Sequence, residues 1–94
     1  MSLYQINQSH YPETVEHDWQ NSLKDGDSVL LIEAGVLRTA KHDIALEALN
    51  AKNIRILLRD SDVKAYGIQP QLGECITDEQ WLHETTLHER IISW

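Results

Sequence analysis

Residues 28–32 read Ser28-Val29-Leu30-Leu31-Ile32, a nearly unbroken apolar run that leads into Glu33-Ala34-Gly35. Continuous apolar runs of this length indicate strands buried on both faces, as in a parallel sheet with helices on each side. A second such run, Ile54-Arg55-Ile56-Leu57-Leu58, follows later in the chain. These two runs predict the inner strands of an α/β sheet.

Weaker signals on either side of these runs extend the expected sheet. Leu3-Tyr4-Gln5-Ile6 alternates apolar and polar residues and predicts a first strand. Glu74-Cys75-Ile76-Thr77 predicts a weak fourth strand. The chain then closes with Ile91-Ile92-Ser93-Trp94, to which the pattern assigns no element.

Helical patterns separate the expected strands. A helix that opens at Pro12 or Glu13 places Val15, Trp19 and Leu23 on one face, and a glycine cap at Gly26 is expected to end it. A second helix is expected over residues 39–51, with Ile44, Ala45, Ala48 and Leu49 facing inward. A short third helix is expected to be capped by Asp60 or Ser61 and ended by Gly67. A last helix, residues 81–89, is expected after the acceptors in Thr77-Asp78-Glu79-Gln80.

Strands and helices thus alternate along the chain, which is the pattern of an α/β fold with right-handed crossovers. The expected architecture is a single three-layer α/β/α sandwich with a small, mostly parallel sheet. One domain, residues 1–94, accounts for the whole sequence. A chain of this length has little stability to spare, so oligomerisation would help it.

Composition narrows the functional classes. The 94 residues include 15 acidic and 8 basic side chains, a net charge of -7, with no cluster of Lys or Arg. Direct nucleic-acid binding is therefore disfavoured. No apolar run approaches the roughly 20 residues that cross a bilayer, so no membrane partner is expected. The single cysteine, Cys75, agrees with a reducing compartment, and a cytoplasmic location is predicted.

Five histidines raise the question of a metal site. His83 and His88 are five residues apart on an expected helix, about 140° around its axis, whereas two ligands on one face need a spacing of four. Neither has a cysteine or a second histidine at a useful spacing. Solvated or partly packed histidines are expected, with no metal ligand.

The polar residues beyond the strand ends offer other candidates. Glu33-Ala34-Gly35 could place backbone N–H groups near an anion, but the chain lacks the glycine-rich nucleotide motifs and the G-x-S-x-G elbow. Asp60 and Asp62 lie where catalytic residues of α/β folds often sit. Helix capping explains them more simply.

Cys75 is the one residue that could hold sulfur as a persulfide, which requires an exposed thiol with a lowered pKa. It stands between Glu74 and Ile76 in an expected strand, where a carboxylate would raise the pKa and neighbours would partly bury the side chain. A structural cysteine is favoured over a reactive one.

The segment from Leu23 to Val36 resembles the TusB/DsrH family, whose members pass through a "GD" turn, here Gly26-Asp27, into an apolar strand and then a "GV" turn, here Gly35-Val36. Residues 3–9 are similar to the family's first strand and its polar exit. The final Trp94 and the chain length also match, so the resemblance covers nearly the whole chain.

The resemblance implies a subunit of a sulfur-relay complex. In such a heterohexamer the chain would associate with TusC-like and TusD-like subunits of the same fold. The TusD-like subunit takes persulfide sulfur from a TusA-like donor and passes it to a TusE-like acceptor, for 2-thiolation of the wobble uridine of tRNA. Related DsrEFH complexes serve sulfur oxidation, which is the alternative role.

One departure decides the expected role. DsrH members of sulfur oxidisers carry a cysteine after the first strand, whereas residues 7–21 contain none, and Cys75 lies elsewhere. The departure favours the tRNA-thiolation branch and an architectural, non-enzymatic subunit. No catalytic, cofactor-binding or metal-binding residue is assigned, and no cofactor is expected.

Apolar residues gather near the end of the chain: Trp81, Ile91, Ile92 and Trp94. They either form an interface with a partner, where aromatic residues are enriched, or fold back on the domain's own core. Two other functions remain open at this point. One is an enzyme or redox carrier that uses Cys75, and the other is a homo-oligomeric domain that binds a small ligand beyond the strand ends.

Overall fold

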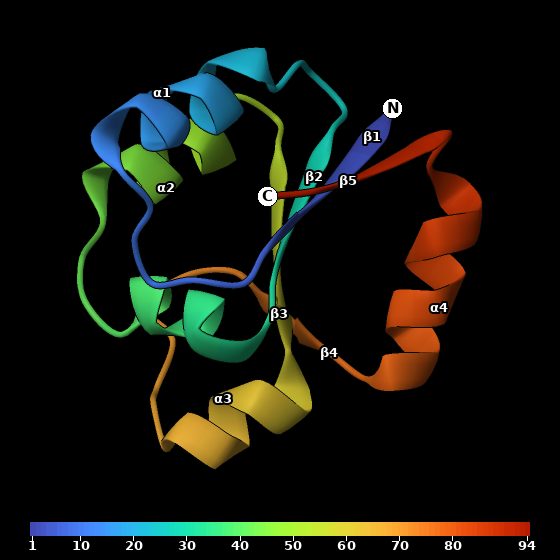
Figure 1. Ribbon diagram of the computed structural model, residues 1–94. Coiled ribbons are helices and arrows are strands. Elements are labelled where there is room, and N and C mark those ends of the chain that lie inside the picture. Colours follow the sequence, from blue (N-terminus) through green and yellow to red (C-terminus); the bar gives the residue numbers. More distant parts are fainter.

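The computed structural model describes residues 1–94 and contains one sheet of five strands in the order β4-β3-β2-β1-β5 (Figure 1). Every neighbouring pair is parallel, so the predicted α/β fold is confirmed and its mostly parallel sheet is wholly parallel. The strands are β1 Ser2–Ile6, β2 Ser28–Leu31, β3 Arg55–Arg59, β4 Glu74–Ile76 and β5 Arg90–Ser93.

The helices form the outer layers of the sandwich. They are α1 Glu13–Ser22, the 3-10 helix η1 Glu33–Thr39, α2 Ile44–Ala51, α3 Asp60–Tyr66 and α4 Asp78–Leu87. Figure 1 shows α1 and α2 on one face of the sheet and α4 on the other, with η1 and α3 beyond the carboxyl ends of the strands. None of these helices combines the length and the apolar character needed to cross a membrane.

Successive strand residues point to opposite faces of the sheet, so the core is divided into two parts. These two parts differ in size. On the side of α1 and α2, 13 buried residues form one cluster that includes Tyr4, Trp19 and Leu58. On the side of α4, only four buried residues cluster: Leu3, Leu30, Leu57 and Ile76. The face beneath α4 is therefore the thinner half of the core.

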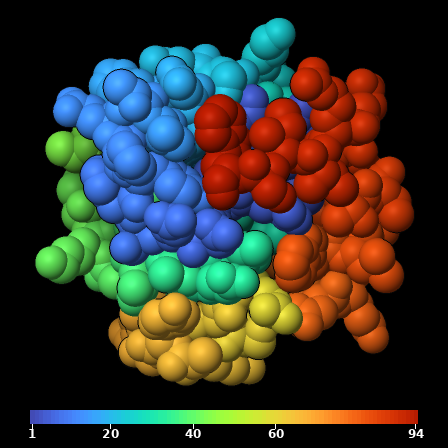
Figure 2. Space-filling view, in the orientation of Figure 1, coloured from blue at the N-terminus to red at the C-terminus, as the bar shows by residue number.

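The strand β5 was not predicted, although it forms an edge of the sheet. It pairs with β1 in the register Leu3 to Ile91 and Tyr4 to Ile92. Ile92 and Trp94 pack against the larger core, and the rings of Tyr4 and Trp94 lie 6.0 Å apart. The last residues, red in Figure 2, lie against the first part of the chain, in blue.

The expectations for the end of α1 and for the start and inward face of α2 are wrong. The helix α1 ends at Ser22 with Leu23 extended, and Gly26 lies instead in the following turn at φ 89°. In α2 the buried residues are Leu46 and Leu49, whereas Ile44 is 77% exposed. The cause is that η1 uses residues 33–39, so α2 begins only after Asp43, whose side chain caps it.

Candidate functional site

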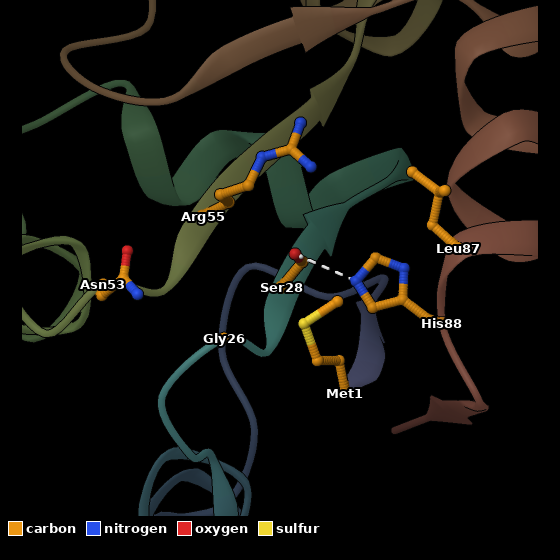
Figure 3. Close-up of a pocket in the computed structure, with 7 residues that line it drawn as sticks. All are labelled: Met1, Gly26, Ser28, Asn53, Arg55, Leu87 and His88. Carbon is orange, nitrogen blue, oxygen red and sulfur yellow. Dashed lines mark hydrogen bonds between the residues drawn. The ribbon is translucent and has the colours of Figure 1, made fainter.

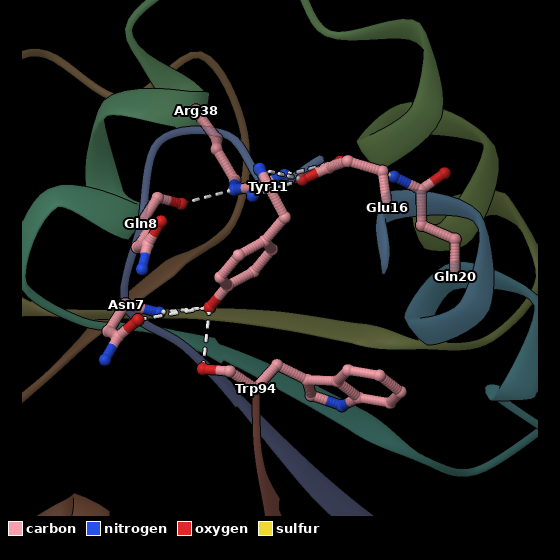
Figure 4. Close-up of polar contacts among 7 residues, drawn as sticks. All are labelled: Asn7, Gln8, Tyr11, Glu16, Gln20, Arg38 and Trp94. Carbon is pink, nitrogen blue, oxygen red and sulfur yellow. Dashed lines mark hydrogen bonds and ion pairs between the residues drawn. The ribbon is translucent and has the colours of Figure 1, made fainter. Parts of the chain in front are cut away.

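The loop that follows β1 is the position where the resemblance places a cysteine in related chains. The Tyr11 hydroxyl lies 2.9 Å from the main-chain oxygen of Trp94 and 3.1 Å from Oδ1 of Asn7, and it accepts the Asn7 N–H at 3.2 Å (Figure 4). Tyr11 itself is buried. The loop is thereby fixed to the end of the chain.

A buried ion pair closes the same loop from the other side. The Arg38 guanidinium donates two hydrogen bonds to the Glu16 carboxylate, at 2.6 and 3.0 Å, and its Nε donates to the carbonyl of Gln8 at 2.8 Å (Figure 4). The side chains of Arg38 and Glu16 are 4% and 12% exposed. Bidentate pairing of this kind satisfies the donors that burial would otherwise leave unpaired.

The environment of Glu16 favours its charged form. Burial by itself would raise the pKa of this carboxyl. Hydrogen bonds from Arg38 and the Tyr11 N–H, with the positive charges of Arg38 and His10, outweigh burial and hold the pKa below its ordinary value. The Arg38 guanidinium carbon also lies 5.3 Å from the ring centre of Tyr11 and 5.4 Å from that of Trp19. These contacts tie the loop after β1 to the core. The loop contains no cysteine.

The turn after β2 binds a carboxylate, which is the side chain of Asp62 in the same chain. Glu33 has φ 50°, and its N–H donates to the Asp62 carboxylate at 2.7 Å. Asp62 also lies 3.5 Å from Arg59. The suggested anion position is therefore filled by the Asp62 side chain.

The expected cap of α3 is corrected by the same contacts. Neither Asp60 nor Ser61 caps the helix, which begins at Asp60 after Arg59 and has no side-chain cap. Asp60 instead pairs with Lys64 at 2.9 Å, and Gly67 ends the helix in the left-handed conformation, as expected. The aspartates serve these local contacts in place of the expected cap.

Cys75 lies on β4, away from the loop after β1, and is exposed, contrary to the partial burial expected. Desolvation of the sulfur and the Asp60 carboxylate raise the pKa of the thiol, and the Lys64 ammonium offsets this only in part. The expected direction is thus found, although Asp60 and not Glu74 is the carboxylate responsible. An exposed thiol with a raised pKa is a poor nucleophile at neutral pH.

The histidines do not converge on a metal position, and no three His, Cys, Asp or Glu side chains are grouped so that they could hold a metal ion. His83 is exposed on α4, whereas His88 is buried. His88 Nδ1 lies 2.7 Å from the Glu84 carbonyl, and Nε2 lies 3.1 Å from the Ser28 hydroxyl (Figure 3). Because a carbonyl only accepts, Nδ1 carries the hydrogen.

This contact between Ser28 and His88 was not anticipated from the sequence. It resembles a nucleophile and base pair, but Ser28 is 1% exposed and His88 8%. The ring satisfies a free carbonyl at the end of α4 and pins that end to β2. The arrangement fastens the helix and does not present the hydroxyl to solvent.

The helix α4 is held to the sheet by further polar contacts. Glu84 accepts two hydrogen bonds from Arg55 Nη1 on β3, at 2.9 and 3.2 Å. The Trp81 indole N–H donates to Oε1 of Gln5 on β1 at 3.0 Å. The helix begins at Asp78 and not at Trp81 as predicted, because the expected acceptors include Thr77 itself, which caps the helix and forms a capping box with Gln80.

The chain is similar to one family of known sequences and to a solved structure. The sequence profile of the family described as DsrH like protein matches residues 9–90. The crystal structure of the ychN protein from E. coli has a TM-score of 0.70 to this chain and 14% sequence identity, and the match covers 100% of this chain and 99% of that chain. At this identity the likeness concerns the fold alone. No curated protein matches the sequence.

Proposed function

The chain belongs to the DsrH-like family of sulfur-relay subunits, and from this membership we propose that it is the structural, non-catalytic subunit of a TusBCD-type complex. The complex supplies persulfide sulfur for 2-thiolation of the wobble uridine of tRNA. Its partners are TusC-like and TusD-like chains in a heterohexamer in the cytoplasm, served by a TusA-like donor and a TusE-like acceptor.

The observation that supports this role best is the construction of the loop after β1. In place of a thiol it contains Tyr11, whose hydroxyl reaches Trp94. The loop is also held by Arg38 of η1, which donates to the Gln8 carbonyl and pairs with Glu16 of α1. Residues that could accept sulfur are absent from positions 7–21. The loop therefore acts as a rigid part of the scaffold, and the sulfur-bearing thiol belongs to a partner subunit.

The remaining thiol is a poor substitute for the missing one. A persulfide carrier must attack a donor persulfide as a thiolate, which requires a lowered pKa. The pKa of Cys75 is raised by desolvation and by Asp60. A net charge of -7 likewise leaves contact with tRNA to other components of the relay.

The test is complementation of cells that lack this chain, with 2-thiouridine in digested tRNA measured by mass spectrometry. We expect the wild-type chain and Cys75→Ser to restore 2-thiouridine equally. A failure of Cys75→Ser, in a variant that folds and accumulates normally, would show that the thiol takes part. Normal 2-thiouridine in cells without the chain would refute the tRNA role itself.

A further inference from the structure

The helix α4 has an unusual distribution of polar and apolar side chains. Toward the sheet it places Trp81 and the buried Glu84, and the buried His88 follows at its end. Away from the sheet, Leu82 is 69% exposed. A helix that serves only to cover a core does the reverse, with its apolar side chains inward. Something other than the domain's own core therefore accounts for Leu82.

A shallow groove lies along one flank of α4. It is lined by Asp78, Trp81, Leu82 and Thr85, which recur every three or four residues and so form one stripe. The Trp81 ring is fixed in place, because its N–H binds Gln5 and the Arg59 guanidinium carbon lies 5.4 Å from the ring centre. A partly buried tryptophan that is already held in one position loses little entropy when a partner covers the rest of it.

The edge strand β5 extends this surface. Ile91 pairs in register with Leu3, which belongs to the core beneath α4, so Ile91 points to the same side of the sheet. It is 46% exposed, and β5 has no further strand beside it. We define the α4/β5 surface by Trp81, Leu82, Thr85 and Ile91.

The charges around this surface indicate its occupant. Asp78 and Glu79 stand in the first turn of α4. Asp78 is paired with Arg59 at 2.9 Å, and Glu89 lies 3.9 Å from the Met1 amino group. Glu79 is exposed and has no such ion pair, so it is the free carboxylate beside this surface. The chain as a whole has a net charge of -7. A second copy would bring the same acidic charge to the contact, whereas a chain with Lys or Arg would complement it.

We propose that the α4/β5 surface is where this chain docks a non-identical subunit of the relay complex, one that inserts an apolar side chain beside Trp81 and Leu82 and places Lys or Arg against Glu79. The identity of that partner as a TusC-like or TusD-like chain rests on the proposed function. The position of the surface rests on the geometry of α4 and β5.

The experiment uses the complex co-expressed with the TusC-like and TusD-like chains of its source, and follows by light scattering the concentration at which this chain dissociates. Leu82→Glu is compared with Ile44→Glu, since Ile44 is a 77% exposed residue of α2 on the other side of the sheet. We expect Leu82→Glu to raise the dissociation constant at least about 30-fold and Ile44→Glu to leave it unchanged.

A second pair of variants tests the charge. Glu79→Lys and Glu13→Lys each replace an exposed acidic residue in the first turn of a helix, α4 and α1 respectively, so both lose the same favourable interaction with the helix dipole. We expect Glu79→Lys to weaken the complex about 3- to 10-fold and Glu13→Lys to have no effect on it.

The outcomes separate the two proposals. An intact complex that Leu82→Glu leaves unchanged, or that Ile44→Glu disrupts equally, would overturn the docking surface and leave the subunit role standing. A homodimer that Leu82→Glu breaks would overturn the choice of occupant. A wild-type chain that binds neither partner would overturn the proposed function.

Discussion

The Tyr11 hydroxyl lies 2.9 Å from the main-chain oxygen of Trp94 and so joins the loop after the first strand to the end of the edge strand β5. The Tyr11 hydroxyl also accepts the N–H of Asn7 at 3.2 Å. One side chain thus connects two segments that are 83 residues apart in the sequence.

Replacing Tyr11 by Phe tests the strength of this connection. We expect Tyr11→Phe to lower the free energy of unfolding by about 1 to 3 kcal/mol, because the Trp94 main-chain oxygen and the Asn7 N–H lose a buried partner while the ring remains. Urea unfolding followed by tryptophan fluorescence measures the change. The exposed Tyr66→Phe is the control and should be neutral. An equal effect at both positions would contradict the role assigned to Tyr11.

The buried pair of Glu16 and Arg38 predicts a dependence of stability on pH. The pKa of Glu16 is lower in the folded chain than its ordinary value of 4.5, so the stability it contributes is present above about pH 4.5 and is lost as the pH falls through the folded pKa. Glu16→Gln should lower the free energy of unfolding at pH 7 by about 3 kcal/mol, since Arg38 is left buried without its counter-charge.

The same variant should also lose part of its acid sensitivity. Urea unfolding between pH 3 and pH 7 measures both effects, with Glu13→Gln on the exposed side of α1 as the matched control. A stability curve for Glu16→Gln that runs parallel to the wild-type curve throughout this range would refute the assignment.

Close packing against the end of β1 leaves no room for a side chain at Gly35. A β-carbon at Gly35 would collide with the carbonyl oxygen of Ile6 and lie 3.0 Å from its carbonyl carbon. That oxygen already accepts the Ile32 N–H, so it cannot move freely. We expect Gly35→Ala to cost about 3 kcal/mol or more.

Gly67→Ala is the comparison for this substitution. Its β-carbon would meet no atom within 4 Å, and only the left-handed φ of 66° opposes it. The cost should be about 1 kcal/mol. Thermal unfolding of the two variants gives the order of the effects, and a greater loss at Gly67 would contradict the packing described at Gly35.

The exposed thiol of Cys75 should react slowly at neutral pH. Because desolvation and the Asp60 carboxylate raise its pKa, alkylation by iodoacetamide should have its midpoint above the ordinary thiol value of 9.0. Asp60→Asn should lower that midpoint, and Lys64→Met should raise it, since the ammonium favours the thiolate. A midpoint below that of a free cysteine would show an activated thiol and would revive the carrier role.

The parts of the fold that could be predicted are those set by neighbouring residues. The apolar run at residues 28–32 marks the central strand, and the acceptors in residues 77–80 mark the start of the last helix. The start of α2 was misjudged because η1 takes residues 33–39, which carry no helical repeat that would distinguish them from a loop.

The parts that could not be predicted depend on contacts between distant segments. β5 exists because β1 offers it an edge, and Ser28 meets His88 only after α4 has crossed the sheet. The pair of Arg38 and Glu16 likewise joins η1 to α1. The spacing of residues along the sequence gives no information on these contacts. The absence of a cysteine in residues 7–21 is visible in the sequence, whereas the hydrogen bonds of Tyr11 and Arg38 around that loop are not.

The mass of the complex that forms when this chain is co-expressed with the TusC-like and TusD-like chains of its source tests the account most directly. Native mass spectrometry should show one stable assembly that contains all three chains, with this subunit present in every particle. A homo-oligomer or a lone monomer, beside a TusC-like and TusD-like complex that assembles without it, would contradict the structural role.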